Sequence, residues 1–255
     1  VDPIKDTKVR SKFITKIISK YLVRNKQSDY CDRYIIGPKQ IIAYTNNSLH
    51  TGCFNYSKMY EIGLPRFSKE WVKRFFKLNY KTIRRNEKLN VILFLSNVKF
   101  NVDTLELDKT ITALSSSVNI NFKIVPHTRS GMSGAKHVKS NITNFSSVEA
   151  IKWADVGIVY GSSIGLHMLV EGVTLIYPQF IDNNTNIYSD NNVAVVVDSL
   201  NDMLDFFESY TFEASKHNID SIDQFINTYI YGGYKSYNSM MERYYFYIVQ
   251  YNETL

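Results

Sequence analysis

The sequence predicts an α/β protein built on a doubly wound parallel sheet. From Leu89 onward, short apolar runs alternate with segments of helical spacing, an order typical of a parallel sheet with helices on both faces. Hydrophobic residues make up 44% of the 255 residues, which is enough for a substantial core. The five predicted strands are residues 90–95, 119–125, 156–160, 173–177 and 194–197.

The first 66 residues are predicted to form an N-terminal segment, a partial lobe or a linker, with a basic amphipathic helix. Residues 1–30 hold eight Lys or Arg against three Asp, and apolar residues recur at helical spacing over residues 10–23. Such a helix could dock on another lobe or lie on an anionic membrane face. Two short strands, or a strand and a turn, are expected over residues 33–37 and 40–45.

Several of the predicted helices have recognisable start signals. One is expected over residues 68–78, with Ser68 as its N-cap. A short helix before Trp153 would be capped by Ser146 or Ser147. Other helices are expected over residues 103–115 and 166–171.

The tail, residues 221–255, is predicted to form two helices broken at Gly232-Gly233. The second of them is rich in aromatic residues, a pattern typical of packing against another part of the protein. We therefore expect the tail to pack back on the N-terminal part, which leaves residues 67–220 as the central domain.

Composition narrows the class of protein. The net charge is +6, which suits a phosphate-bearing partner, and Cys31 and Cys53 lack both zinc-site spacing and the number needed for a disulfide scaffold. No apolar run reaches the roughly 20 residues of a membrane span. We expect a cytoplasmic protein with peripheral contact at the inner face of the membrane. Because the chain begins with Val1, we also expect that it is a truncated form of a longer protein.

The stretch from Trp153 to Pro178 contains the strongest candidate for a binding site. Its Gly-Ser-Ser-Ile-Gly turn, residues 161–165, follows a buried strand and precedes a helix. Backbone N–H groups there, with the hydroxyls of Ser162 and Ser163, could converge on a phosphate, and Gly165 would allow close approach. Small residues also serve any tight strand-to-helix turn, so the pattern alone leaves a purely structural role open.

Two further loops carry cationic or titratable side chains. His127 and Arg129 follow the predicted strand 119–125, so they and Ser162 fall at successive strand ends of one sheet. Imidazole titrates near neutrality and guanidinium binds phosphate, so His127 is assigned the catalytic role and Arg129 a binding role. Arg66, in the third loop, could bind an oxyanion with its bidentate fork. A loop-capping histidine and a surface arginine are the structural alternatives.

Other catalytic classes find no support. The sequence lacks a GxGxxG fingerprint, a phosphate loop ending in Gly-Lys-Ser/Thr, a GxSxG elbow and an HExxH motif. No metal site and no cofactor are therefore predicted. Asp182 and Asp190 lie in a polar loop, residues 181–192, that could reach a ligand or serve as a plain surface connection.

Taken together, these residues resemble the C-terminal, donor-binding half of a bacterial GT-B glycosyltransferase, of the Kdo-transferase or teichoic-acid glycerophosphotransferase type. The likeness rests on the Ile-Gly-Leu-Pro-Arg run at residues 62–66, the Pro-His-Thr-Arg loop at 126–129, and the run from Ala154 to Pro178. It implies a Rossmann-like lobe over residues 67–220 that binds a nucleotide-sugar donor, with an abbreviated N-terminal segment.

The resemblance also implies an activity and a partner set. A metal-independent enzyme would transfer the sugar to a saccharide or glycolipid acceptor in capsule or other surface-polysaccharide synthesis, without nucleic acid as a partner. Ser162, Ser163 and Gly165 would hold the donor phosphate. His167 stands where family members commonly carry a ribose-binding Glu, so His167 or Glu171, one helical turn later, would take that contact.

Two alternatives remain open from the sequence. A sugar-nucleotide epimerase shares the GT-B architecture but needs acidic and basic groups on both sides of a hexose. A non-catalytic binding or scaffold module could instead use the basic helix and the aromatic tail at a membrane surface.

Overall fold

The computed structural model describes residues 34–36, 59–75, 88–96, 102–127, 141–183, 187–210, 219–234 and 236–248. The chain divides into two compact units. The larger runs from Lys69 to Ile226, and the smaller joins the residues before Lys69 to those after Ile226. Each unit is described by itself below. The expected three-part division into residues 1–66, 67–220 and 221–255 stays a prediction.

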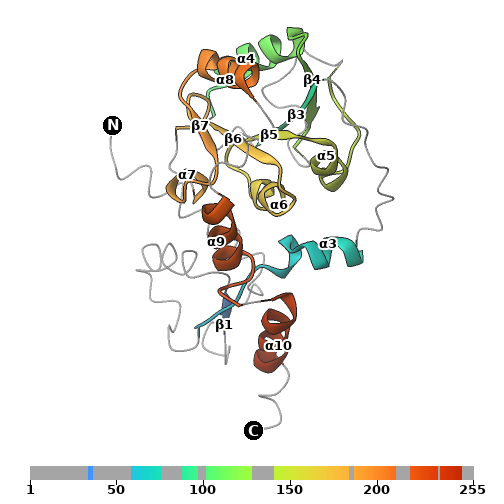
Figure 1. The fold of residues 1–255 in the computed structure, drawn as a ribbon, viewed down its shortest axis with the longest axis vertical. Helices are drawn as coiled ribbons and strands as arrows, with labels where there is room; N and C mark the ends of the chain where they lie inside the picture. Colours follow the sequence, from blue (N-terminus) through green and yellow to red (C-terminus); the bar gives the residue numbers. More distant parts are fainter. Residues whose placement is uncertain are drawn as a thin grey trace, which may run out of the picture. The chain divides into compact units, whose positions relative to one another are not determined.

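The larger unit is built on a five-stranded sheet in which every strand pair is parallel (Figure 1). The strands are β3 (Leu89–Phe94), β4 (Ile120–Val125), β5 (Val156–Val159), β6 (Thr174–Pro178) and β7 (Val195–Val197). Their lateral order is β4-β3-β5-β6-β7. This confirms the predicted fold class and all five predicted strands.

The central strands are apolar because helices cover both of their faces. All four residues of β5 are buried, as are five of the six residues of β3. Polar side chains lie at the amino ends of the strands. There the amide of Asn121 donates to the side-chain oxygen of Asn90 at 3.0 Å, and Asp155 accepts from the Asn90 backbone N–H at 2.9 Å.

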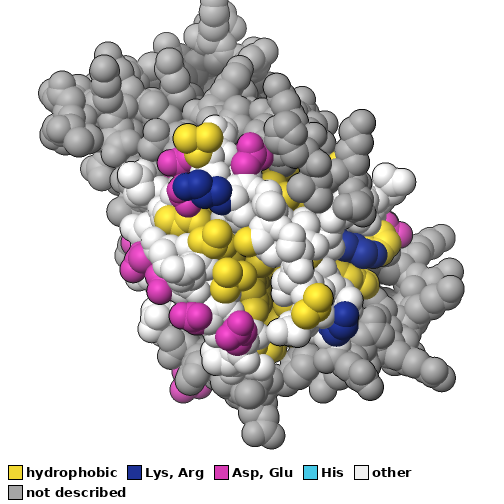
Figure 2. All heavy atoms as spheres, turned by 90° about the horizontal axis from the view of Figure 1, so that it is seen from above, with side chains coloured by type: hydrophobic (Ala, Val, Ile, Leu, Met, Phe, Trp, Pro, Cys, Tyr) yellow, Lys and Arg dark blue, Asp and Glu magenta, His cyan; other side chains and the backbone are white. Residues whose placement is uncertain are grey.

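Two layers of helices enclose the sheet. Helices α4 (Thr104–Ser116) and α8 (Leu200–Ser209) cover one face, and α5 (Ser147–Trp153) and α6 (Ile164–Val170) cover the other (Figure 1). Figure 2 looks onto the α4–α8 side, where hydrophobic side chains form a band with acidic side chains along its border. Exposed Asp202, Asp205 and Glu208 of α8 contribute to the acidic character of this side.

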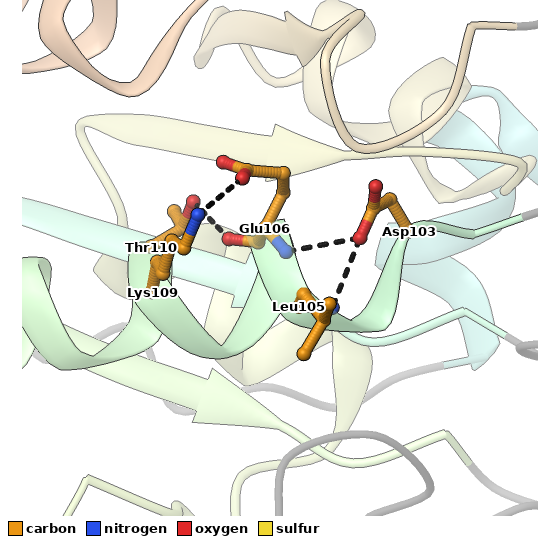
Figure 3. A network of polar contacts seen from close by, with 5 residues as sticks. All are labelled: Asp103, Leu105, Glu106, Lys109 and Thr110. Atoms are coloured by element: carbon orange, nitrogen blue, oxygen red, sulfur yellow. Dashed lines mark hydrogen bonds and ion pairs between the residues drawn. The ribbon is translucent and has the colours of Figure 1, made fainter.

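The helix starts follow the expected capping chemistry. Ser146 caps α5, and Glu149 completes a capping box by accepting from the Ser146 backbone N–H at 2.8 Å. Asp103 caps α4, where one carboxylate oxygen accepts from the backbone N–H groups of Leu105 and Glu106 at 3.0 and 3.1 Å (Figure 3). Both helices therefore begin within a residue of the predicted positions.

The larger unit contains further helices. Helix α3 (Lys69–Phe75) lies within the helix predicted over residues 68–78, whose last residues fall outside the described part. The Ser68 hydroxyl donates to the Pro65 carbonyl at 2.8 Å. Helix α7 (Ile187–Asp190) connects β6 to β7, and α9 (Ile219–Tyr229) begins in this unit.

In the smaller unit, β1 (Tyr34–Ile36) pairs in parallel with β2 (Met59–Glu61). The 3-10 helix η3 (Pro65–Phe67) and α10 (Tyr237–Ile248) complete its described elements. The strand predicted over residues 40–45 and the basic helix over 10–23 lie outside the described residues. The predicted break at Gly232-Gly233 is confirmed, because both glycines have positive φ between α9 and α10.

Close backbone packing explains two glycines of this unit. The Leu64 N–H donates to the Ile230 carbonyl at 2.6 Å. A Cβ on Gly63 would lie 2.2 Å from the same carbonyl oxygen, and one on Gly232 would lie 2.4 Å from the Gly63 nitrogen. The Ile-Gly-Leu-Pro-Arg run is therefore held against the segment that follows α9. Among the described residues, no helix combines the length and apolarity that a membrane span requires.

Candidate functional site

The sheet topology selects one edge for ligand binding. The chain passes from β3 outward to β4 and then returns to β5 on the other side of β3, so the strand order reverses between β3 and β5. In doubly wound sheets, ligands bind at the carboxyl ends of the strands at such a reversal. Ser96 follows β3 and Gly161 follows β5, and the Ser96 hydroxyl donates to the Gly161 carbonyl at 3.3 Å. The predicted Gly161–Gly165 turn therefore lies at the reversal point.

The turn leaves backbone donors available. Gly161 has a φ of 53°, which starts the sharp change of direction from β5 into α6. The Ser162 hydroxyl oxygen accepts from the Ile164 N–H at 3.3 Å. The N–H groups of Ser163 and Gly165 have no hydrogen-bond acceptor among the described residues. Two backbone donors and the exposed Ser163 side chain thus stand at this edge of the sheet.

A tyrosine that the sequence analysis did not single out closes one side of the turn. The Tyr188 hydroxyl, from α7, donates to the Ser162 carbonyl at 2.9 Å. A Cβ on Gly165 would lie 2.7 Å from the Tyr188 Cζ, so only glycine permits this ring position. Burial raises the pKa of Tyr188, so its phenol stays protonated and can donate a hydrogen bond.

A second group of buried polar side chains lies at the carboxyl ends of β5 and β6. The Tyr177 hydroxyl donates to an Asp182 carboxylate oxygen at 2.8 Å, and Asp182 is only 1% exposed. The Tyr160 hydroxyl is buried without a partner in bonding geometry among the described residues. Burial, reinforced by the charge of Asp182, raises the pKa of Tyr160.

The structure places Asp182 in the protein interior. The sequence left open whether the polar loop over residues 181–192 reaches a ligand or is a plain surface connection, and a buried carboxylate was not expected from either alternative. The apolar Ile181 just before it, itself 1% exposed, was the available signal. The Ile181 carbonyl also accepts from the Asp103 N–H at 2.9 Å, which ties this loop to the start of α4.

His127 lies two residues beyond the end of β4 and is half-buried. The ends of β4 and β5 are successive in the chain but not adjacent in the sheet, because β3 lies between them. Two strand spacings separate the His127 position from the turn by about 10 Å, a span that a diphosphate-linked ligand could cover. Arg129 falls outside the described residues.

His167 and Glu171 lie at different distances from the turn along α6. His167 lies in the middle of α6 and is half-buried. Glu171 follows the last residue of α6, about 6 Å further from the turn along the helix axis. Its carboxylate forms an ion pair with the Lys152 ammonium of α5, and the two side chains are 12% and 26% exposed.

The surroundings of this ion pair are basic. Burial lowers the pKa of Lys152, and the neighbouring charges of Lys69 and Lys73 lower it further. The Glu171 carboxylate supplies the opposite charge beside this ammonium group. Glu171 therefore has a partner within the larger unit, at the end of α6 opposite the turn.

Arg66 belongs to η3 in the smaller unit. Its side chain is exposed, and its Cζ lies 4.3 Å from the centroid of the Phe67 ring. This contact is a cation–π interaction. Within the described ranges, no group of three or more His, Cys, Asp or Glu side chains could hold a metal ion.

No protein-family model matches the sequence, and no curated protein matches it. Among solved structures, the chain is similar to WaaG, a glycosyltransferase involved in lipopolysaccharide biosynthesis, with 13% identity and a TM-score of 0.49 over 84% of this chain and 62% of that chain. It is also similar to the wall teichoic acid polymerase TagF, with 12% identity and a TM-score of 0.49 over 81% of this chain and 55% of that chain.

A glycosyltransferase from Rickettsia africae is similar at 14% identity, with a TM-score of 0.49 over 95% of this chain and 80% of that chain. The chain spans less than two thirds of the length of the WaaG and TagF structures. Similarity at this level leaves the reaction to be argued from the site.

Proposed function

We propose that this protein is a glycosyltransferase-like enzyme that binds a nucleotide-activated sugar at the carboxyl ends of β3 and β5. The observation that carries the proposal is the Gly161–Gly165 turn at the point where the strand order reverses. Its available Ser163 N–H group and its serine hydroxyls are suited to phosphate oxygens. The diphosphate of a nucleotide sugar would bind there.

The reaction follows from the chemistry of such a donor. An acceptor hydroxyl oxygen forms a bond to the anomeric carbon, and the bond from that carbon to the phosphate oxygen breaks. The departing nucleotide phosphate keeps the electron pair, and backbone N–H groups at the turn stabilise its negative charge. The acceptor proton passes to a base, a role that we assign to His127 because an imidazole nitrogen can accept a proton.

Other residues take binding roles in this proposal. Arg129 and Arg66 would contact phosphate oxygens, and His167 would contact the ribose. The Lys152 ion pair makes Glu171 the weaker candidate for that ribose contact. The acceptor would be a saccharide or glycolipid of a surface polysaccharide, reached from the cytoplasmic side of the membrane.

Calorimetric titration with CDP, UDP and GDP tests the donor site. We expect one nucleotide to bind, and Ser162→Ala to weaken binding several-fold because the hydroxyl that accepts from Ile164 N–H is lost. Ser209→Ala is the matched control, since its hydroxyl donates to the Asp205 and Phe206 carbonyls of its own helix, α8. If none of the three nucleotides binds, the proposal is wrong.

A second experiment addresses the reaction itself. The protein is incubated with CDP-, UDP- and GDP-sugars and candidate saccharide acceptors, and the released nucleotide and the products are separated. His127→Ala should abolish transfer while nucleotide affinity changes little. Arg66→Ala should weaken donor binding several-fold. Conversion of UDP-N-acetylglucosamine to its 2-epimer without transfer would replace this proposal with the epimerase.

A further inference from the structure

We infer that Tyr188 is a positioning residue that holds the Ser162–Ser163 peptide in the orientation needed for phosphate binding. The inference rests on the proposed function and deepens it, because it names the residue that keeps the turn in its ligand-binding conformation. It starts from one hydrogen bond, in which the Tyr188 hydroxyl donates to the Ser162 carbonyl at 2.9 Å.

This hydrogen bond sets the direction of a donor. The Ser162 carbonyl and the Ser163 N–H belong to one planar trans peptide, so the two groups point in opposite directions. When Tyr188 holds the carbonyl toward α7, the Ser163 N–H is directed away from α7. That N–H has no acceptor among the described residues, so it is left for a ligand.

The tyrosine is itself well anchored. It is 5% exposed, its ring centroid lies 6.2 Å from that of Phe225 in α9, and its carbonyl accepts from the Val193 N–H at 3.0 Å. The side-chain amide of Asn191 further caps the Ile187 carbonyl at 2.7 Å. A ring packed in this way can hold the turn at little entropic cost.

Gly165 completes the arrangement. A Cβ at this position would lie 2.7 Å from the Tyr188 Cζ and 2.8 Å from its hydroxyl oxygen. The absence of a side chain therefore lets the ring reach over the start of α6 to the Ser162 carbonyl. Within the turn, the Ser162 hydroxyl accepts from the Ile164 N–H at 3.3 Å. The turn is thus held by one hydrogen bond within it and by one from Tyr188 of α7.

Preorganisation of this kind strengthens binding because the free turn already has the orientation found in the complex. Without the tyrosine hydroxyl, the Ser162–Ser163 peptide can rotate, and some copies of the free protein direct the N–H elsewhere. The binding free energy that is lost cannot exceed the net contribution of one hydrogen bond. Nucleotide affinity should therefore fall by about five-fold.

The test compares Tyr188→Phe with Tyr210→Phe in the full chain. Both substitutions remove one hydroxyl, and Tyr210 is the matched control because its hydroxyl contacts the Thr174 hydroxyl at 3.1 Å, near the amino end of β6. Amide NMR spectra of the ligand-free proteins are recorded first. We expect the Ser163 amide signal to shift or broaden in Tyr188→Phe and to stay unchanged in Tyr210→Phe.

Titration with CDP, UDP and GDP follows on the same proteins. We expect about five-fold weaker binding to Tyr188→Phe and unchanged binding to Tyr210→Phe. An unchanged Ser163 signal, or equal affinities for wild type and Tyr188→Phe, overturns the positioning role. If the wild type binds no nucleotide, the proposed function fails, and the ligand-free spectra still decide whether Tyr188 orients the peptide.

Discussion

Replacement of Glu171 by Gln separates a structural ion pair from a ligand contact. The substitution keeps the size of the side chain and removes the charge that faces Lys152. Exposed ion pairs contribute about 0–1 kcal/mol, whereas breaking a buried pair costs about 3–5 kcal/mol. The two side chains are 26% and 12% exposed, between these limits. We therefore expect the free energy of unfolding to fall by about 1–3 kcal/mol.

Urea unfolding followed by circular dichroism measures this change, and calorimetry with the nucleotide that binds the wild type measures affinity. Glu106→Gln is the matched control, because its ion pair with Lys109 at 2.7 Å has side chains that are 32% and 65% exposed. The control should lose less than about 1 kcal/mol. Both variants should keep wild-type nucleotide affinity.

The stability of Glu171→Gln should change with pH in a defined direction. Burial and the charges of Lys69 and Lys73 depress the pKa of Lys152 in the folded state below its ordinary 10.5. The unfolded chain therefore holds more protons than the folded one in the alkaline range just below 10.5, and stability rises with pH there. Loss of the Glu171 carboxylate removes a charge that favours the protonated amine, so this rise should be steeper in Glu171→Gln, and the stability difference from the wild type should narrow as the pH rises.

One result would refute the structural assignment of Glu171. If Glu171→Gln unfolds like the wild type but loses nucleotide affinity, the carboxylate contacts the ligand and its pairing with Lys152 contributes little. Equal destabilisation by Glu171→Gln and Glu106→Gln would instead show that the partial burial of the first pair adds nothing.

Three further changes test the local packing and capping. Gly165→Ala should destabilise the protein by about 1–3 kcal/mol in urea unfolding, because the new Cβ overlaps the Tyr188 ring. Asp103→Ala should cost about 1 kcal/mol by removing the cap of α4, and an unchanged unfolding midpoint would contradict that role. Hydrogen bonds from the Ser146 backbone and hydroxyl lower the pKa of Glu149, so its stabilising effect is present above about 4.5 and is lost as the pH falls through the folded-state pKa. The stability difference between wild type and Glu149→Gln should therefore shrink in acid.

Local sequence patterns were sufficient to locate the elements of the sheet. Apolar runs of strand length identified all five strands, and the serines near Glu149 placed the start of α5 at Ser146 or Ser147. These features depend on residues close together in the chain, where burial and hydrogen bonding act on a short segment. The Gly161–Gly165 turn belongs to the same group, since it follows directly from a strand, small residues and a helix.

The lateral order of the strands needed the tertiary structure. Hydrophobicity indicates that a strand is buried but not which strands are its neighbours. The sequence therefore could not show that β3 separates the ends of β4 and β5, or that the reversal point lies between β3 and β5. This order sets the distance between His127 and the turn, on which the proposed chemistry depends.

The same limit applies to individual polar side chains. The partners of Asp182 and Glu171 come from other elements or from the far side of a turn, and Tyr188 reaches the Ser162 carbonyl from 26 residues away. Whether such a side chain is buried, paired or directed at a ligand depends on what the packed elements bring next to it. By itself, the sequence determined the strands, the turn and the class of fold. Tertiary packing decided that Glu171 pairs with a lysine and that Tyr188 holds the turn, because long-range contacts have no local pattern.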